Sequence, residues 1–270
     1  MRIGAISDIH IDINENYPLQ DILSETINRN KLDLLLIAGD ISNNYQVSIQ
    51  FVEKLKSNSG VPVYFVPGNH DLWDLENKID DTWKIYETFS EHPDCLCGKI
   101  IELDDWSIIG NPGWYDYSKG NKTYNIEDFD KKTINRRVWQ DSINVKWNKT
   151  DNEVHNIMLQ NLEKQLLSCN GKNIITVTHM LTLPEFKVPE SWQNWDYFNA
   201  FLGSKDYGEL FKNFNVKYSI MGHVHFRKQL IKNKIDYRCV CLGYHKEWKN
   251  KDVYSEVQDA LSIIDTESSI

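Results

Sequence analysis

The sequence predicts an α/β fold with a parallel β-sheet at its core. Along the first 66 residues, short runs of apolar β-formers alternate with stretches that carry apolar residues at helical spacing. A strand, a helix and a second strand form a crossover that joins parallel neighbours in a sheet. Two such crossovers fit in this span, so the core sheet is expected to be parallel.

Each element of these crossovers has its own signal. Three runs are continuous, apolar and too short for helices, as is typical of strands buried on both faces. They cover residues 2–7, 32–38 and 63–66. The stretches between them place apolar residues three or four positions apart, which predicts amphipathic helices. These cover residues 17–30 and 47–55.

The rest of the chain predicts further strands and helices. Residues 72–89 and 203–214 carry helical patterns, and residues 173–178 and 216–221 are apolar runs typical of strands. Two stretches contain paired apolar runs around a polar turn, which predicts β-hairpins. They cover residues 99–109, turning at Asp104 and Asp105, and residues 226–242, turning at Asn233 and Lys234.

We expect a single domain, residues 1–270, because large α/β domains reach this size with one core. Residues from about 114 to 170 are rich in Lys, Asn, Asp and aromatics, and we interpret them as a mainly helical cap inserted beside the site. Such insertions commonly set substrate choice. Trp114 and Tyr115 could stack on a base or sugar, although core packing also explains them. Arg136 and Arg137 could clamp a remote phosphate, with a solvated face as the alternative.

Polar residues with oxygen or nitrogen donor atoms follow five of the predicted strands. Each of these apolar runs ends on carboxylate, imidazole or carboxamide groups. If the strands are parallel neighbours, these groups meet at the sheet edge where ligands bind in open α/β folds. The candidate metal-binding residues are Asp8, His10, Asp40, Asn69, His179, His223 and His225.

This donor set predicts two metal ions rather than one. Seven mixed oxygen and nitrogen donors are too many for one ion and suit two ions that share a carboxylate. Asp8 and His10, like His223 and His225, are two positions apart, so both members of each pair point to the same side of an extended segment. Two close cations repel each other unless an anion bridges them. Asp40, at the end of a buried strand, is the best candidate for that bridge.

Taken together, these motifs resemble the calcineurin-like metallophosphoesterases. The family pattern is D-x-H, G-D, G-N-H-D/E, a lone H and G-H-x-H, and the chain carries it complete and in order. The resemblance implies a four-layer α-β-β-α sandwich of two mixed sheets with helices outside. It places one ion on Asp8, His10, Asp40 and His225, and the second on Asp40, Asn69, His179 and His223. Gly113-Trp114-Tyr115 and Leu242-Gly243-Tyr244 more faintly resemble an uncharacterised bacterial subgroup of phosphoesterases.

The resemblance also implies a reaction, the hydrolysis of a phosphodiester or other small phosphorylated substrate by a hydroxide that bridges two divalent cations. Asp40 and His70 would be the catalytic residues, with His70 protonating the leaving oxygen or stabilising charge on the phosphoryl group. In phosphomonoester-cleaving relatives an Asp often pairs with this His. Here Asn43, also a candidate substrate-binding residue, stands at that position and adds no negative charge, although Asp71 or Asp12 could substitute.

Three other functions stay open. They are phosphomonoester hydrolysis, cleavage of short single-stranded nucleic acid, and a non-catalytic binding scaffold. The net charge of −9 leaves the surface acidic even with two divalent cations, which opposes binding to long nucleic acids and favours a small phosphorylated substrate. The donor set accepts Mn, Fe, Ni, Co or Zn. No sequence feature indicates an oligomeric state.

The expected location is cytoplasmic, without a membrane partner. No run approaches the roughly 18 apolar residues that cross a bilayer. A strand that starts at residue 2 leaves no room for a signal peptide. The five cysteines form no secreted-type framework; the pairs Cys95/Cys97 and Cys239/Cys241 could hold zinc, but reduced buried thiols are the better interpretation.

Overall fold

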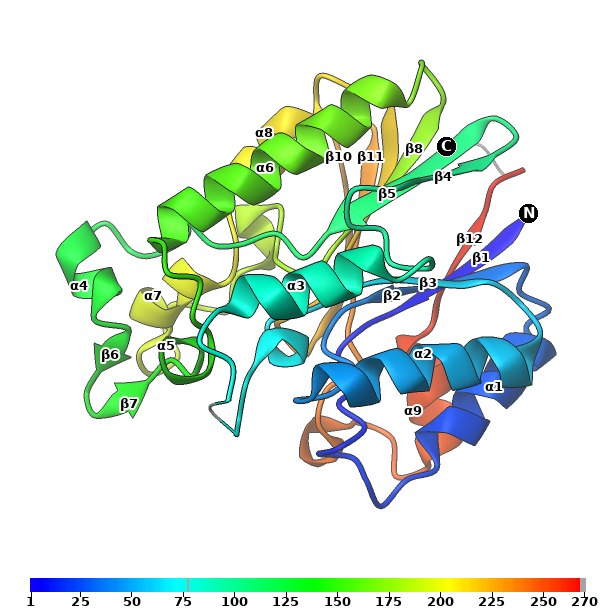
Figure 1. Cartoon of the computed structure of the whole chain (residues 1–270), viewed down its shortest axis with the longest axis horizontal. Helices are drawn as coiled ribbons and strands as arrows, with labels where there is room; N and C mark the ends of the chain where they lie inside the picture. Colours follow the sequence, from blue (N-terminus) through cyan, green and yellow to red (C-terminus); the bar gives the residue numbers. More distant parts are fainter. Residues whose placement is uncertain (77, 268–270) are drawn as a thin grey trace.

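The computed structural model describes residues 1–76 and 78–267. Two β-sheets stack face to face, and helices cover both outer surfaces (Figure 1). This confirms the four-layer α-β-β-α sandwich. No helix among the described residues is long and apolar enough to cross a membrane.

The first sheet contains the three strands expected from the start of the chain. Its order is β12-β1-β2-β3. The strands β1 (Arg2–Ile6), β2 (Leu34–Ala38) and β3 (Val63–Val66) are parallel, as the two crossovers predict. The edge strand β12 (Ser262–Asp265) pairs antiparallel with β1 and was not predicted.

The second sheet is mixed. Its order is β10-β11-β9-β8-β5-β4, with parallel strands in the middle and an antiparallel hairpin at each edge. Both predicted hairpins are confirmed. The six strands are β4 (Ile100–Leu103), β5 (Trp106–Asn111), β8 (Asn173–Thr178), β9 (Val216–Met221), β10 (Arg227–Lys232) and β11 (Ile235–Val240).

Helices pack on the outer face of each sheet (Figure 1). Polar side chains fix the N-termini of several helices. The Asn44 side chain accepts hydrogen bonds from free backbone N–H groups in the first turn of α2. Thr150 and Glu153 form a capping box at the start of α6. The first sheet is covered by α1 (Leu19–Arg29), α2 (Tyr45–Ser59), α3 (Thr82–Glu91) and α9 (Val253–Ala260), and the second by α6 (Asp151–Ser168) and α8 (Asp206–Phe211).

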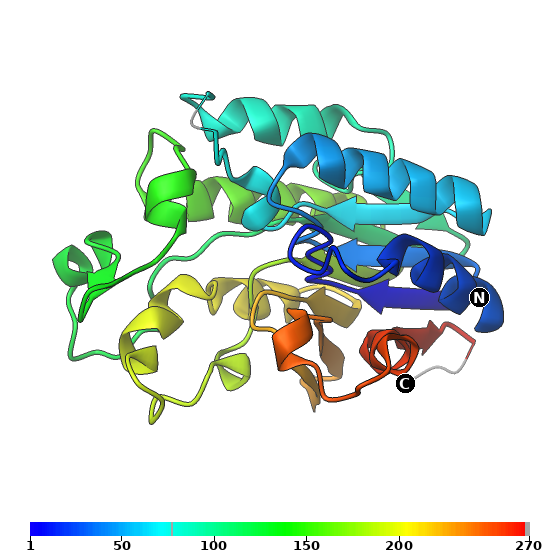
Figure 2. The same ribbon diagram turned by 90° about the horizontal axis from the view of Figure 1, so that it is seen from below.

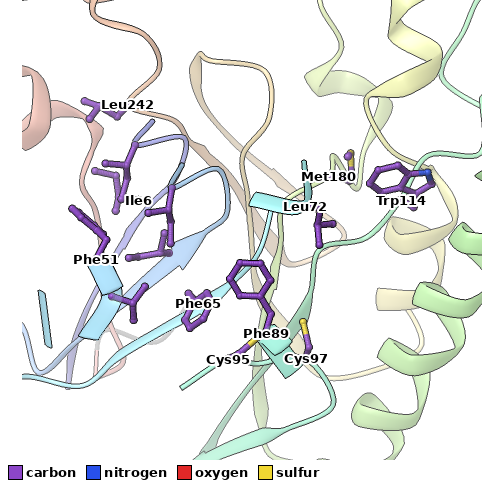
Figure 3. Close-up of a cluster of buried hydrophobic side chains, with 14 of the residues drawn as sticks. Ile6, Phe51, Phe65, Leu72, Phe89, Cys95, Cys97, Trp114, Met180 and Leu242 are labelled. Carbon is purple, nitrogen blue, oxygen red and sulfur yellow. The ribbon is translucent and has the colours of Figure 1, made fainter. Parts of the chain in front are cut away.

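Strand alternation divides the core into layers. Along β2, Leu34 and Leu36 face the second sheet, whereas Leu35 and Ile37 face the helices. Under the helices, Phe65, Phe89, Cys95 and Cys97 pack together (Figure 3). All five cysteines are free, buried and part of apolar clusters, in agreement with reduced thiols.

One predicted helix is wrong over part of its length. The predicted helix 72–89 begins instead at the end of the 3-10 turn η1 (His70–Leu72) and continues as a non-helical connection. The helix α3 starts only after Asp81, which caps its first turn. Trp73 is extended and stacks on His70, so tertiary contacts outweigh the helical pattern here. Residue 77 lies outside the described residues.

The segment expected to form a cap divides in two. Its last helix, α6, packs on β5 and belongs to the outer layer of the sandwich. The preceding residues extend from the body of the molecule on the side of α7 (Trp195–Phe198), as Figures 1 and 2 show. They form α4 (Ile126–Asp130), the short strands β6 (Thr133–Ile134) and β7 (Arg137–Val138), and α5 (Asp141–Asn144).

Candidate metal centre

The predicted donor residues gather at one edge of the sandwich. Three of the strands that deliver them, β1, β2 and β3, belong to the first sheet, and β8 and β9 belong to the second. Because the sheets stack face to face, the carboxyl ends of all five strands meet there. The structure thus brings together Asp8, His10, Asp40, Asn69, His179, His223 and His225.

The backbone at this edge is unusual. Five of the donor residues adopt the left-handed region, which residues with a Cβ atom rarely occupy. The φ angles are 54° at Asp8, 44° at His10, 55° at Asp40, 78° at His223 and 53° at His225. Such backbone strain clusters at functional sites, where the surrounding structure holds it.

Two motif glycines allow the loops to approach closely. A Cβ atom at Gly68 would lie 2.1 Å from Oδ1 of Asp40, and one at Gly222 would lie 2.5 Å from Oδ2 of Asp8. Real Cβ atoms do not come this close to an oxygen. Glycine therefore stands at these positions because the neighbouring carboxylates occupy the space of a side chain.

Donor atoms of Asp8, His10, Asp40 and His225 form the first group, and all lie within 4.8 Å of one another. Nε2 of His10 is 3.0 Å from Nε2 of His225 and 3.7 Å from Oδ2 of Asp40. Oδ1 of Asp8 is 3.5 Å from Nε2 of His225. Two imidazoles and two carboxylates therefore point at one small volume.

Asp40 also belongs to a second group, with His179 and His223. Nε2 of His179 lies 3.3 Å from Oδ2 of Asp40, 3.1 Å from Nδ1 of His223 and 2.9 Å from Oδ1 of Asn69. The Asp40 carboxylate is fully buried, and its Oδ2 has no hydrogen-bond partner among the described residues. It faces both groups.

Hydrogen bonds to the outer ring nitrogens orient these imidazoles. Nδ1–H of His179 donates to the Ala38 carbonyl at 2.9 Å, and Nε2–H of His223 donates to the Phe201 carbonyl at 3.3 Å. Each inner nitrogen then carries a lone pair, and these lone pairs face each other across 3.1 Å. Such a pair repels unless a cation or proton lies between the rings. Together with the unpartnered Asp40 oxygen, the arrangement fits metal ions.

The electrostatics of the site also suit cations. Burial lowers the pKa values of His10 and His223, which favours the neutral, metal-binding form of both rings. Burial alone would also lower the pKa of His179, but the Asp40 carboxylate outweighs it and raises the pKa to about 10. Without a metal ion, a proton therefore lies on Nε2 of His179, and a bound cation would take the place of that proton. Although burial raises the pKa of Asp40, the neighbouring His179 and His70 hold it well below its usual range. The carboxylate thus stays charged and attracts a positive partner.

His70 stands beside this centre on the cleft wall. Its Nδ1–H donates to Oδ1 of Asn43 at 2.6 Å, its ring stacks on Trp73 at 3.7 Å, and its Nε2 is 4.0 Å from Oδ2 of Asp40. Burial lowers the pKa of His70, so the ring is neutral near pH 7. A neutral ring that donates through Nδ1 presents a lone pair at Nε2, which weakens it as a proton donor.

A cleft of about 390 Å³ opens over the donor residues. One wall contains Asp40, Asn69, His70, His223 and His225. A second part of the lining comes from the β7–α5 region and from α7, and it includes three aromatic side chains. Its residues include Arg137, Trp139, Trp195 and Phe198, and the guanidinium of Arg137 lies 5.7 Å from the centre of the Phe198 ring.

A family model for calcineurin-like phosphoesterases matches residues 1–227. The chain belongs to this family. It is 26% identical over 285 residues to Uncharacterized protein L509 of Acanthamoeba polyphaga mimivirus, covering 98% of this chain and 99% of the relative. It is 34% identical over 160 residues to a protein of Fibrobacter succinogenes described as a probable cyclic nucleotide phosphodiesterase, a match that covers 38% of this chain and 61% of the relative.

Two solved structures illustrate how far the fold is shared. Phosphopantetheinyl hydrolase from Mycobacterium tuberculosis superposes with a TM-score of 0.76 at 18% identity, covering 99% of this chain and 98% of the other. The protein TT1561 of Thermus thermophilus gives 0.55 at 13% identity, covering 89% and 88%. Both likenesses concern the fold alone.

Asp141 is a residue of this calcineurin-like phosphoesterase that the sequence analysis missed. It comes from α5, is 1% exposed and accepts three hydrogen bonds of 2.8 Å: Oδ1 from Nδ2 of Asn69 and Nε1 of Trp73, and Oδ2 from Nε1 of Trp139. Because Nδ2 of Asn69 faces this carboxylate, Oδ1 of Asn69 faces His179. No motif surrounds Asp141, so only the fold identifies it.

Asp12 and Asp71 are the two carboxylates expected to replace the Asp that Asn43 substitutes beside His70. Neither of them contacts the His70 ring. Oδ2 of Asp12 accepts the backbone N–H of Asn43 at 3.0 Å. Asp71 is buried, and burial raises its pKa to about 7. It ties together the loops that follow β2 and β3 by accepting hydrogen bonds from the backbone of Gly68, Asp40, Ile41 and Ser42 and from the hydroxyl of Ser48.

The predicted substrate-binding role of Trp114 and Tyr115 is wrong. Both side chains are fully buried, and Nε1 of Trp114 donates to Asp151 at 2.8 Å. The chain leaves β5 beneath α6 rather than above the cleft, so Trp114 lies in the interior near Met180 (Figure 3). Arg136 is exposed and does not line the cleft, and Asn43 acts on His70 instead. Of the five predicted substrate contacts, only Arg137 lines the cleft.

Proposed function

We propose that the protein is a metal-dependent phosphoesterase that hydrolyses a phosphodiester bond in a small substrate at a centre of two divalent cations. The shared Asp40 carboxylate carries this proposal, because its unpartnered Oδ2 faces two sets of imidazole nitrogens. When bound, the cations would lower the pKa of a water molecule and neutralise phosphate charge. One would be held by Asp8, His10, Asp40 and His225, the other by Asp40, Asn69, His179 and His223.

The donor chemistry restricts the metals. Mixed imidazole, carboxylate and amide donors suit Mn²⁺, Fe, Co, Ni and Zn²⁺. The hydrogen bond from Nδ1 of His225 to Oε2 of Glu247, at 2.8 Å, supports a ligand role for His225, because histidine ligands commonly donate their second N–H to a carboxylate. We choose Mn²⁺ as the metal for the assays below.

Charge in the cleft favours a phosphodiester over a phosphomonoester. A monoester carries a charge near −2 at neutral pH, whereas a diester carries −1. Among the described residues that line the cleft, Arg137 is the one cation beyond the candidate ligands. Asp141 and Glu247 add two carboxylates to the lining, and His70 is neutral. Asn43 adds no charge to assist His70. The partial match to a probable cyclic nucleotide phosphodiesterase supports the same bond class.

The shape of the cleft supports a small substrate with an organic group next to the phosphate. Trp139, Trp195 and Phe198 supply flat apolar surface within the same cleft as the candidate ligands. We propose that the β7–α5 region acts as the cap and selects this group. The described lining of the cleft contains one arginine, and the net charge of the chain is −9, so neither supports a long nucleic acid as substrate.

The His70→Ala substitution should reduce kcat/KM by an amount that depends on the leaving group of the substrate. On bis-p-nitrophenyl phosphate, whose leaving group departs without protonation, we expect a modest loss of kcat/KM, within about tenfold. On a diester with an alkyl leaving group we expect a larger loss, on the order of 100-fold, the lower range of general acid catalysis, because the neutral ring can still take up a proton at Nε2 and pass it to the leaving oxygen. His92→Ala, on a histidine outside the cleft, serves as control. Equal losses on both substrates would contradict a role for His70 toward the leaving oxygen.

A further inference from the structure

A second cluster of donor groups lies apart from the candidate metal centre, where the cap segment leaves the sandwich. Asp116 follows β5, His155 belongs to α6 and Asp206 is the first residue of α8. One donor atom from each of the three residues lies within 4.8 Å of the other two. Neither the family motifs nor the proposed reaction uses these residues.

The orientation of His155 is the observation that points to a ligand. The side chain is 2% exposed, and its Nδ1–H donates to the Trp114 carbonyl at 3.3 Å. Its Nε2 points at the carboxylates, 3.5 Å from Oδ2 of Asp206, and has no hydrogen-bond partner among the described residues. A buried lone pair directed at a carboxylate is repulsive unless a cation or proton lies between them. A histidine whose other nitrogen donates to a backbone carbonyl is also the usual form of a metal ligand.

In the part of the chain that the structure describes, no lysine or arginine forms an ion pair with either carboxylate. Lys119 is buried nearby, but the hydrogen bond that its ammonium donates goes to the Leu181 carbonyl, at 3.0 Å. Burial lowers the pKa of Lys119 to about 7 against the opposing effect of Asp116 and Asp206, so the lysine neutralises these carboxylates only in part at neutral pH. Asp116 accepts hydrogen bonds from the Ser204 hydroxyl at 2.7 Å and the Ser118 N–H at 3.0 Å. These bonds orient it without neutralising it.

We propose that Asp116, His155 and Asp206 bind a divalent cation of the Zn²⁺ or Mn²⁺ class, separate from the candidate metal centre. One imidazole and two carboxylates suit either ion, and water would complete the coordination. Asp116 and Asp206 are partly exposed, which gives an ion access from solvent. The bound cation would join the loop after β5 to α6 and α8 and so stiffen the base of the cap. The proposal does not depend on the proposed reaction.

The test compares the number of bound ions in three proteins. Wild-type protein, Asp206→Asn and Glu209→Gln are each dialysed against Zn²⁺, and their metal content is measured. Glu209 lies on the same helix, is exposed and pairs with Lys212, so it controls for the loss of one charge. We expect Asp206→Asn to bind one ion per chain fewer than the other two proteins. Asp116→Asn should give the same loss, and Zn²⁺ should raise the Tm of wild type more than that of either variant.

Mn²⁺-dependent diester hydrolysis, measured on the same samples, separates this proposal from the proposed function. Asp206→Asn should keep wild-type activity, because Asp206 does not line the catalytic cleft. Equal Zn²⁺ content in wild type and both aspartate variants would overturn the proposal and identify His155 and Asp206 as a simple ion pair. Loss of all ions together with activity in folded Asp206→Asn, judged by circular dichroism, would also overturn a separate site.

Discussion

Replacing Asp40 by Asn is expected to abolish phosphodiester hydrolysis while leaving the fold intact. Asparagine keeps the size of the side chain, and it keeps the Oδ1 atom that accepts a hydrogen bond from the backbone N–H of His70 at 2.9 Å. It removes the charge shared by the two donor groups. We expect kcat on bis-p-nitrophenyl phosphate to fall at least 10²- to 10³-fold, roughly the loss that follows removal of one electrostatic stabiliser. Metal content should fall at the same time.

The matched control is Asp21→Asn, the same chemical change on the exposed face of α1. It should change neither metal content nor kcat. His179→Ala removes a ligand from only one of the two groups and should likewise abolish activity. If Asp40→Asn keeps kcat within about tenfold of wild type at saturating Mn²⁺, a smaller loss than removal of one stabilising group causes, Asp40 does not bridge the cations.

Replacing Asp141 by Asn is expected to weaken the metal centre from outside the set of ligands. Three N–H groups donate to this buried carboxylate, from Asn69, Trp73 and Trp139. An amide has only one acceptor atom, so its own NH₂ group must face at least one of these donors. In either orientation the Asn69 amide loses the charged acceptor that turns its oxygen toward His179, because an amide oxygen accepts a hydrogen bond more weakly than a carboxylate does. We expect a loss of about 10- to 100-fold in Mn²⁺ affinity or kcat/KM, the usual effect of removing such a partner.

Two measurements separate this role from simple stabilisation of the cap. The Mn²⁺ concentration for half-maximal activity should rise in Asp141→Asn, whereas a purely structural role would lower Tm and leave that concentration unchanged. Glu127→Gln, an exposed residue of α4, is the control for charge loss in the cap segment. Unchanged Mn²⁺ dependence in folded Asp141→Asn would show that Asn69 does not need this partner.

Much of the sandwich, and the meeting of the seven candidate donor residues at one of its edges, could be predicted because the signals are local. An apolar run such as Leu34–Ala38 can hardly be anything but a buried strand, and Asp40 follows it directly. Chain order then makes neighbouring strands parallel, which brings their carboxyl ends together. Two sheets rather than one provide those ends, a feature that the family pattern implied and that spacing alone did not.

The features that could not be predicted depend on contacts between distant parts of the chain. Residues 72–89 have a helical pattern, yet Trp73 leaves it to stack on His70 and to donate to Asp141. Trp114 and Tyr115 have the composition of a ligand-binding segment, but the path of the chain under α6 buries them. Asp141 has no sequence signal at all, because its importance arises only when the cap segment folds back onto Asn69.

The most direct test of the central claim is hydrolysis of bis-p-nitrophenyl phosphate and p-nitrophenyl phosphate by metal-stripped protein, titrated with Mn²⁺. The account predicts no turnover without metal, recovery as Mn²⁺ is added, and a higher kcat/KM for the diester. Full turnover by metal-stripped protein would contradict the metal centre. Faster cleavage of the monoester would contradict the assignment as a phosphodiesterase and would require a group other than Asn43 to assist His70.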